Sequence, residues 1–140
     1  MKVEAIHVRA PDETEVREVG VVDAIAGKGL DGDRYFFADG ARAGLALTLI
    51  EGDVVRGAGL EPGSTHRQVT VTGAGLNDLV GKKFRVGSVE CYGVMLCEPC
   101  LHLQEMTRPG IIKELVHRAG LNADILTDGS ISVGDEVVTI

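Results

Sequence analysis

Long hydrophobic runs are absent from this sequence. No stretch of its 140 residues approaches the roughly 20 apolar residues that a membrane-spanning helix needs. The first six residues, Met1 to Ile6, place an acidic Glu4 where a signal peptide would have its apolar core. Cysteine is scarce as well, and an odd count of three without a secretion signal favours reduced thiols. We therefore expect a cytoplasmic protein that makes no membrane contact.

Positive charge is also in short supply. The 14 Lys and Arg residues are outnumbered by 21 Asp and Glu residues, which gives a formal net charge of −7 at pH 7. Proteins that hold nucleic acids by their phosphates need a basic surface, so this composition argues against a nucleic-acid partner. It is still compatible with a small anionic ligand in a local basic pocket.

Glycine, in contrast, is abundant: 19 of the 140 residues are glycine, about twice the usual share of roughly 7%. The glycines stand between short apolar segments, where they indicate turns. Strands are predicted at residues 2–9, 16–26, 46–50, 68–72, 83–86, 89–92 and 124–126, and residues 131–138 are predicted to close the chain around a Val-Gly turn like the one at Val86-Gly87. Helices are predicted at residues 51–58 and 110–119, with Gly120 capping the second and a helical turn at 76–81.

These elements predict one domain over residues 1–140, mainly β with short helices, built as a small and partly closed β-barrel. Within the first strand, alternation puts Val3 on one face and Ile6 nearer the other.

The stretch Cys97-Glu98-Pro99-Cys100 carries the most specific chemical signal. Two thiols three positions apart, with His102 close behind, can bind a metal, exchange a disulfide or carry sulfur. Pro99 suits the opening of a helix, where unpaired N–H groups favour a thiolate. We therefore expect Cys100 to be accessible and to have a lower pKa than Cys91, which the strand pattern places in the core. Packing as a small apolar residue is an open alternative for Cys97, and zinc is the weaker option because no second ligand pair exists.

A glycine-rich loop spans residues 27–35 (GKGLDGDRY) and contains charges of both signs. Its three glycines let the backbone approach another group closely. The loop is neither GxGxxG nor a Walker loop, and it lacks the glutamate that closes a calcium loop. Spacing alone is also compatible with an exposed loop that holds an Asp–Arg pair. Further along, His66 and Arg67 stand at a strand entrance, where basic groups face either a pocket or solvent.

Several stretches in this order resemble a MOSC domain, the family named after the C-terminal domain of molybdenum cofactor sulfurase. They are Gly29–Arg34 (GLDGDR), Thr65–Gly73 (THRQVTVTG), Leu76–Gly81 (LNDLVG), Cys97–Cys100 (CEPC) and Gly129–Val137 (GSISVGDEV). The likeness runs from about Gly20 to the C-terminus. One departure is Arg67-Gln68, where many small members of the family carry Arg-Asn, so the hydrogen bonding at that corner differs.

The resemblance implies a barrel-like fold with a pocket for the molybdenum cofactor, a pterin that bears a phosphate and a dithiolene. By its match to the family's Pro-Cys, Cys100 would ligate molybdenum, since a soft thiolate suits a sulfur-rich site. Cys97 is the second candidate catalytic residue. The cofactor-binding candidates are Lys28, Gly32, Asp33, Arg34, His66 and Arg67. Lys28, Arg34 and Arg67 among them would anchor the phosphate.

Two functional hypotheses follow from the resemblance. The first is a molybdenum-dependent oxidoreductase that reduces N-hydroxylated small molecules. Its electrons would come from a separate protein, because the chain has no set of four cysteines for an iron–sulfur cluster. The alternative is a non-enzymatic carrier of the cofactor or of sulfur, which a sulfur donor protein would load onto Cys100 as a persulfide and Cys97 would resolve.

Overall fold

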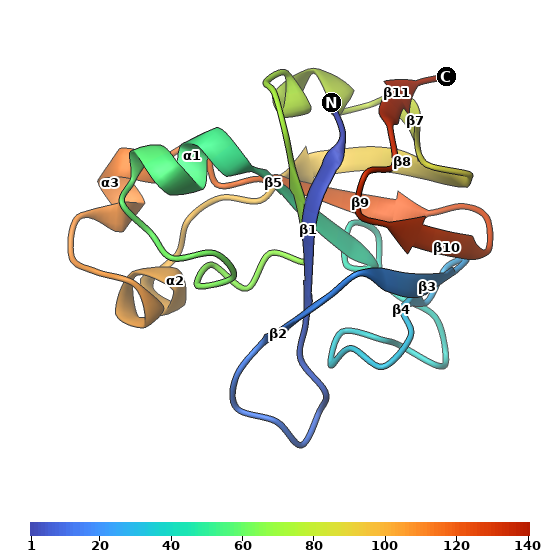
Figure 1. The fold of residues 1–140 in the computed structure, drawn as a ribbon, viewed down its shortest axis with the longest axis horizontal. Coiled ribbons are helices and arrows are strands. Elements are labelled where there is room, and N and C mark those ends of the chain that lie inside the picture. Colours follow the sequence, from blue (N-terminus) through green and yellow to red (C-terminus); the bar gives the residue numbers. More distant parts are fainter.

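Short strands make up most of the fold in the computed structural model, which describes residues 1–140 (Figure 1). The strands are β1 (Val3–Val8), β2 (Arg17–Val19), β3 (Val21–Ile25), β4 (Gly29–Leu30), β5 (Leu47–Glu51), β6 (Val69–Val71), β7 (Lys83–Val86), β8 (Val89–Leu96), β9 (Leu121–Ile125), β10 (Gly129–Ser132) and β11 (Val137–Thr139). The helices are α1 (Gly52–Gly57), α2 (Leu101–Met106), α3 (Ile111–Leu115) and the 3₁₀-helix η1 (Leu76–Leu79). The prediction of a mainly β fold with short helices is confirmed.

Eight strands form one curled sheet in the order β11-β7-β8-β9-β5-β6-β1-β2. Its one parallel strand pair, β5 with β6, has α1 in its connection, as a parallel crossover requires. The start of β1 meets the segment that leads into β11: Lys2 bridges Glu136, and the Val3 N–H donates to the Asp135 carbonyl oxygen at 2.8 Å. These contacts draw the sheet into a half-barrel and bring the two termini together (Figure 1).

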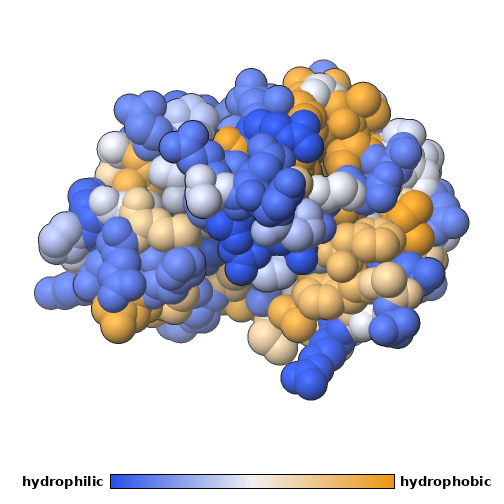
Figure 2. Space-filling view, turned by 90° about the horizontal axis from the view of Figure 1, so that it is seen from below, coloured by the Kyte–Doolittle hydropathy of each residue, from blue (hydrophilic) through white to orange (hydrophobic).

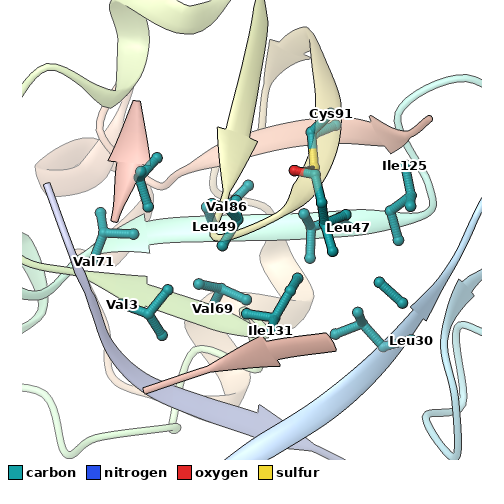
Figure 3. Packing of buried hydrophobic residues seen from close by; sticks show 14 of the residues in the cluster. Val3, Leu30, Leu47, Leu49, Val69, Val71, Val86, Cys91, Ile125 and Ile131 are labelled. Carbon is teal, nitrogen blue, oxygen red and sulfur yellow. Dashed lines mark hydrogen bonds between the residues drawn. The ribbon is translucent and has the colours of Figure 1, made fainter. Parts of the chain in front are cut away.

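A second sheet of β10, β3 and β4 packs against the half-barrel and completes its core. Twenty-two buried residues form this core. Figure 3 shows Leu30 and Ile131 of the small sheet directed towards Leu47, Leu49 and Val69 of the large one. The apolar alternation of the strands is what supplies these inward-facing side chains.

The helices bury a separate and smaller cluster. Its members are Ala58, Leu103, Ile111, Leu115 and Ala119. Figure 1 shows α1, α2 and α3 gathered at one end of the sheet, beyond the edge of the barrel core. Because α2 follows directly after Cys100, this helical layer positions one side of the C-x-x-C stretch.

Two predicted elements differ from the structure. The strand predicted at residues 16–26 is divided at Gly20 into β2, which pairs with β1, and β3, which pairs with β10. The helix predicted at residues 110–119 ends at Leu115, because Val116 has a ψ of 128° and His117 has a φ of +61°. Gly120 therefore does not cap this helix but leads into β9.

The predicted faces of the first strand are also wrong. Val3 and Ile6 both lie in the barrel core. A β-bulge between Val3 and Ala5 inserts one residue and returns Ile6 to the face that Val3 occupies.

None of the helices has the length and hydrophobicity needed to span a bilayer. In Figure 2, hydrophilic residues gather across the centre of the face seen from below, with patches of hydrophobic residues beside them.

Candidate functional site

A cavity of about 280 Å³ brings together candidate residues from three distant parts of the sequence. It is lined by Arg34 from the loop after β4, by His66 and Arg67 ahead of β6, and by Cys97 and Cys100 after β8. Ligand cavities commonly measure roughly 300–1,000 Å³, so this one is small but close to that range. A hollow of about 360 Å³ near α1 and η1 is larger, but it contains no thiol. We therefore place the candidate site in the smaller cavity.

The basic side of this cavity has nitrogen atoms without acceptors. Arg67 donates from Nε to the Ala119 carbonyl oxygen at 2.9 Å and from Nη1 to the Thr65 carbonyl oxygen at 3.3 Å. Its Nη2 is buried and has no partner. The Arg34 guanidinium lies 4.6 Å from the Tyr35 ring centroid and forms no ion pair with a carboxylate. Buried donors are normally satisfied, so Arg67 Nη2 is available to an anionic ligand, and the exposed Arg34 guanidinium is likewise not engaged by a carboxylate.

His66 shows that this region is electropositive. Burial lowers the pKa of its imidazole, and the nearby Arg34, His102 and Arg67 lower it further. Its φ of +59° is rare for a residue with a side chain, which is typical of functional sites where the surroundings impose the conformation. The chain as a whole is acidic, so a cluster of four basic side chains here is a local feature.

Asp33 does not line this cavity, but it fixes the loop that carries Arg34. Its Oδ1 accepts the Arg9 N–H at 2.8 Å, and its Oδ2 accepts the Tyr35 N–H at 3.1 Å and Gln68 Nε2–H at 2.7 Å. Burial raises the pKa of this carboxyl group, and the hydrogen bonds from Tyr35 and Gln68 partly oppose that effect. Gln68 also accepts the Thr48 N–H at 2.9 Å, which ties the loop to β5.

The glycines of this loop have separate tasks. A Cβ on Gly29 would lie 2.6 Å from the Tyr35 carbonyl oxygen, so the tight fold of the loop requires glycine there. Gly32 is exposed with a φ of +83° and forms the turn that directs Asp33 inward. Lys28 lies apart from the other candidates, in the turn between β3 and β4, and does not line the cavity.

The three cysteines are free and differ in exposure. Cys91 is fully buried in the barrel core, as its position in the strand predicted. Burial and the nearby Asp124 raise the pKa of its thiol to about 12. Burial also raises the pKa of Cys97, although the Arg67 guanidinium opposes this. Cys100 is exposed at the N-terminal boundary of α2, so the prediction that it is accessible is confirmed.

No group of three or more His, Cys, Asp or Glu side chains is arranged to hold a metal ion. A closed zinc site made of protein ligands alone would need four such side chains.

Sequence reasoning missed part of the cavity wall. Tyr35, Leu45 and Met106 give it an apolar side, and Thr48, Gln68 and His102 add polar groups. His102 and Met106 are four residues apart on α2, a spacing that places both on one helix face and could have signalled a shared surface. Nothing in the sequence connects Leu45 or Tyr35 to the thiols, because only the tertiary fold brings them together.

The comparison with protein-family models identifies one family. A family model described as the MOSC domain matches residues 45–138, well over half of the chain. The solved structure of the YuaD protein from Bacillus subtilis has a TM-score of 0.79 at 16% identity, over 97% of this chain and 93% of that one. The structure of YiiM from Geobacillus stearothermophilus has a TM-score of 0.75 at 16% identity, and the match covers 99% of this chain and 74% of that one. The structure of YiiM from Escherichia coli has a TM-score of 0.68 at 14% identity, and the match covers 100% of this chain and 70% of that one.

No curated protein matches the sequence. At these identities the similar structures show the fold alone. The family match adds the sequence evidence, and its range contains His66, Arg67, Cys97 and Cys100, whereas Arg34 precedes it. The chain belongs to the MOSC domain family.

Proposed function

We propose that this chain binds the molybdenum cofactor in the cavity between Arg34, Arg67 and Cys100. One observation carries the proposal: an acidic protein gathers basic side chains, one of them with a buried and unpartnered guanidinium nitrogen, in the same cavity as two thiols. A phosphate-bearing pterin that holds a metal by sulfur needs both features.

The residues present fit this group. Arg67 Nη2 and the Arg34 guanidinium would donate to the phosphate, and His66, which lies near both, lines the same cavity. The Cys100 thiolate would act as the protein's ligand to the metal. The cavity is small, but Tyr35, Leu45 and Cys100 are exposed at its edge, so a larger ligand can extend outward from there.

The reaction class that we propose is reduction of N-hydroxylated small molecules. The bound cofactor would supply the two-electron reduction that removes the hydroxyl oxygen from the substrate nitrogen, and a separate protein would deliver the electrons. The chain's own residues would hold and orient the reactants. Tyr35, Leu45 and Met106 offer an apolar wall to the organic part of a substrate, and the basic side chains hold the anionic end of the cofactor.

A sulfur-carrier function is the second candidate, because Cys100 is exposed and has no protein partner for its thiol. In this scheme the Cys100 thiolate attacks the outer sulfur of a donor persulfide, a new S–S bond forms on Cys100, and the donor leaves as a thiolate. The sulfur could then pass from Cys100 to an acceptor in the cavity.

The test is to produce the protein in a host that makes the cofactor and to measure molybdenum and pterin per chain. Arg34→Ala removes one phosphate contact, worth roughly 1.5–3 kcal/mol for a charge-assisted hydrogen bond. We therefore expect cofactor retention to weaken about tenfold or more. Arg85→Ala is the matched control, since Arg85 is exposed on β7 and lies outside the cavity.

Cys100→Ala separates the two candidates. It should remove the metal's protein sulfur ligand, while the phosphate of the pterin is still held by the basic side chains. The enzyme hypothesis also requires that loaded wild-type protein reduce a hydroxylamine-type substrate with a chemical electron donor. The carrier hypothesis requires a persulfide on Cys100 after exposure to a sulfur donor, without turnover. Wild-type protein that binds neither molybdenum nor pterin and takes up no sulfur would refute both.

A further inference from the structure

His117 has a backbone conformation that few residues with a side chain adopt, with a φ of +61°. Such a conformation persists where surrounding contacts impose it. The His117 N–H donates to Glu98 Oε1 at 2.7 Å, and its ring Nδ1 contacts Glu98 Oε2. Its carbonyl oxygen accepts Asn77 Nδ2–H at 2.8 Å. The side chain inside the C-x-x-C stretch is therefore bound to a strained residue 19 positions away.

The residues next to His117 hold two other parts of the cavity. The Ala119 carbonyl oxygen accepts Arg67 Nε–H, and the Gly120 carbonyl oxygen accepts the Cys97 N–H at 2.8 Å. Gly120 itself is held against β5, since a Cβ there would lie 2.3 Å from the Leu49 carbonyl oxygen. We call residues 117–120 the clasp, because this short segment binds Glu98, Cys97 and Arg67 together.

The clasp holds the C-x-x-C stretch in an extended form. Cys97 continues the pairing of β8 with β9, whose last partners are Leu96 and Leu121. Glu98 precedes a proline, which disfavours the helical region, and Pro99 itself cannot leave a φ near −65°. Cys100 has a φ of −132° and a ψ of 173°.

An extended stretch keeps the two thiols from bonding to one another. Three extended residues span about 10 Å. A disulfide requires Cα atoms within about 7 Å of one another. A Cys97–Cys100 disulfide therefore needs the backbone between them to fold and Glu98 to leave the clasp.

We propose that Glu98 is a positioning residue that keeps Cys97 and Cys100 as free thiols by binding the clasp. Oxidation would take two electrons and two protons from the two thiols and give them to a small-molecule disulfide, which becomes two thiols. The new S–S bond would form only at the expense of the Glu98 contacts to His117, so these contacts oppose it. The proposal concerns the chain without ligand and does not rest on the proposed function.

The reduction potential of the Cys97–Cys100 pair tests this. The full chain, free of cofactor, is equilibrated in glutathione buffers, and the thiols are alkylated and located by peptide mass spectrometry, which separates them from Cys91. In Glu98→Ala we expect the constant for disulfide formation to rise roughly tenfold, a shift of about 30 mV to more negative potential. Glu98 is 43% exposed, so its removal leaves the core intact, which circular dichroism and thermal melting verify.

Two further variants make the result specific. Glu98→Gln keeps an oxygen that can accept the His117 N–H, so it should recover at least half of the shift. Glu105→Ala removes an exposed carboxylate of α2 that has no hydrogen-bonded partner, and it should keep the wild-type potential. The proposal is overturned if Glu98→Ala has the potential of Glu105→Ala or a less negative one. It is also overturned if the wild-type pair already lies below about −300 mV, where structural disulfides lie.

Discussion

The three cysteines differ in how deeply their thiols are buried, and therefore in their expected reactivity. The Cys91 thiol is fully buried with a pKa raised to about 12, so almost none of it is thiolate at neutral pH. Cys97 is partly buried with a raised pKa, and Cys100 is exposed. The thiolate is the nucleophile, so reactivity follows exposure and pKa together.

We therefore expect iodoacetamide to label Cys100 first, Cys97 more slowly and Cys91 only after unfolding. Rates measured against pH and assigned by peptide mapping provide the check, with denatured protein as the control in which all three thiols react alike. Labelling of Cys91 before Cys100 in the folded protein would contradict this order.

Among the titratable residues, His7 couples folding to pH. It is 5% exposed, and burial lowers the pKa of its imidazole, although the Glu18 carboxylate opposes the effect. Near pH 6.5 the unfolded chain takes up a proton at His7 that the folded chain does not accept, so acid favours the unfolded state. The contribution of neutral His7 to the unfolding free energy is fully present above about pH 6.5. It is lost progressively as the pH falls towards the lowered pKa of His7 in the folded state.

His7→Gln should therefore flatten the fall in unfolding free energy between about pH 7 and pH 5.5, by at most about 1.4 kcal/mol per pH unit. Urea titrations at each pH measure the slope. Glu18→Gln is the matched variant: it removes the group that raises the His7 pKa, so the loss should extend to lower pH. An unchanged slope in His7→Gln would show that the folded protein accepts the proton as readily as the unfolded chain.

At the scale of elements, the loop of residues 27–35 depends on one buried carboxylate. Asp33 is 5% exposed and accepts hydrogen bonds from two backbone N–H groups and from Gln68. Removing it would leave these donors without their acceptor, each at a cost of about 1–3 kcal/mol. The loop also carries Arg34, so its order and the basic side of the cavity depend on the same bonds.

Asp33→Ala should accordingly lower the unfolding free energy by about 2–4 kcal/mol in urea titrations. Asp33→Asn keeps one acceptor oxygen and should fall between the alanine variant and the wild type. If Asp33→Ala lies within about 0.5 kcal/mol of the wild type, as exposed substitutions do, the loop is held by other contacts.

The sequence predicted those elements whose apolar pattern is local. The hairpin of β7 and β8, the buried strand β5 and the helix α1 all lie where alternation and glycine positions indicated. The failures have tertiary causes. The bulge near Val3 depends on pairing with β6, and α3 stops early because His117 is held in a left-handed conformation by Glu98 and Asn77.

The candidate site was predictable where residue chemistry identifies it. Arg34, Arg67 and Cys100 were selected through the resemblance to the MOSC family together with their chemistry as basic groups and a thiol, and the fold brings them to one cavity. Lys28 was selected on the same ground and lies elsewhere, because the turn between β3 and β4 separates it from the cavity. The role of Gln68 as a link between Asp33 and Thr48 could be seen only in the structure. Gln68 is 35 residues from Asp33 and 20 residues from Thr48 along the chain, and no sequence pattern pairs such positions.

At the scale of the whole molecule, the site lies where two separately packed regions meet. Arg67 precedes β6 of the barrel, whose core has 22 residues, while Cys100 opens α2 in the helical layer, whose cluster has five. Helices of five and six residues are not stable alone, so the helical layer depends on that small cluster. A ligand bound by both Arg67 and Cys100 would join the two regions.

We therefore expect the helical layer to open more easily than the barrel. In native-state hydrogen exchange, amides of α2 and α3 should exchange through local openings, and amides of β5, β8 and β9 only near the global unfolding free energy. Leu115→Ala and Leu49→Ala are matched truncations of side chains that are 1% and 0% exposed, each expected to cost about 2–5 kcal/mol in its own cluster. Leu115→Ala should speed exchange in α2 and α3 while largely sparing the strands, because the loss falls on the layer that already opens by itself. Leu49→Ala should speed exchange in the strands, since it lowers the global unfolding free energy. Equal acceleration of all amides by Leu115→Ala would mean that barrel and helical layer unfold as one unit, and Cys100 would then be as rigidly placed as Arg67.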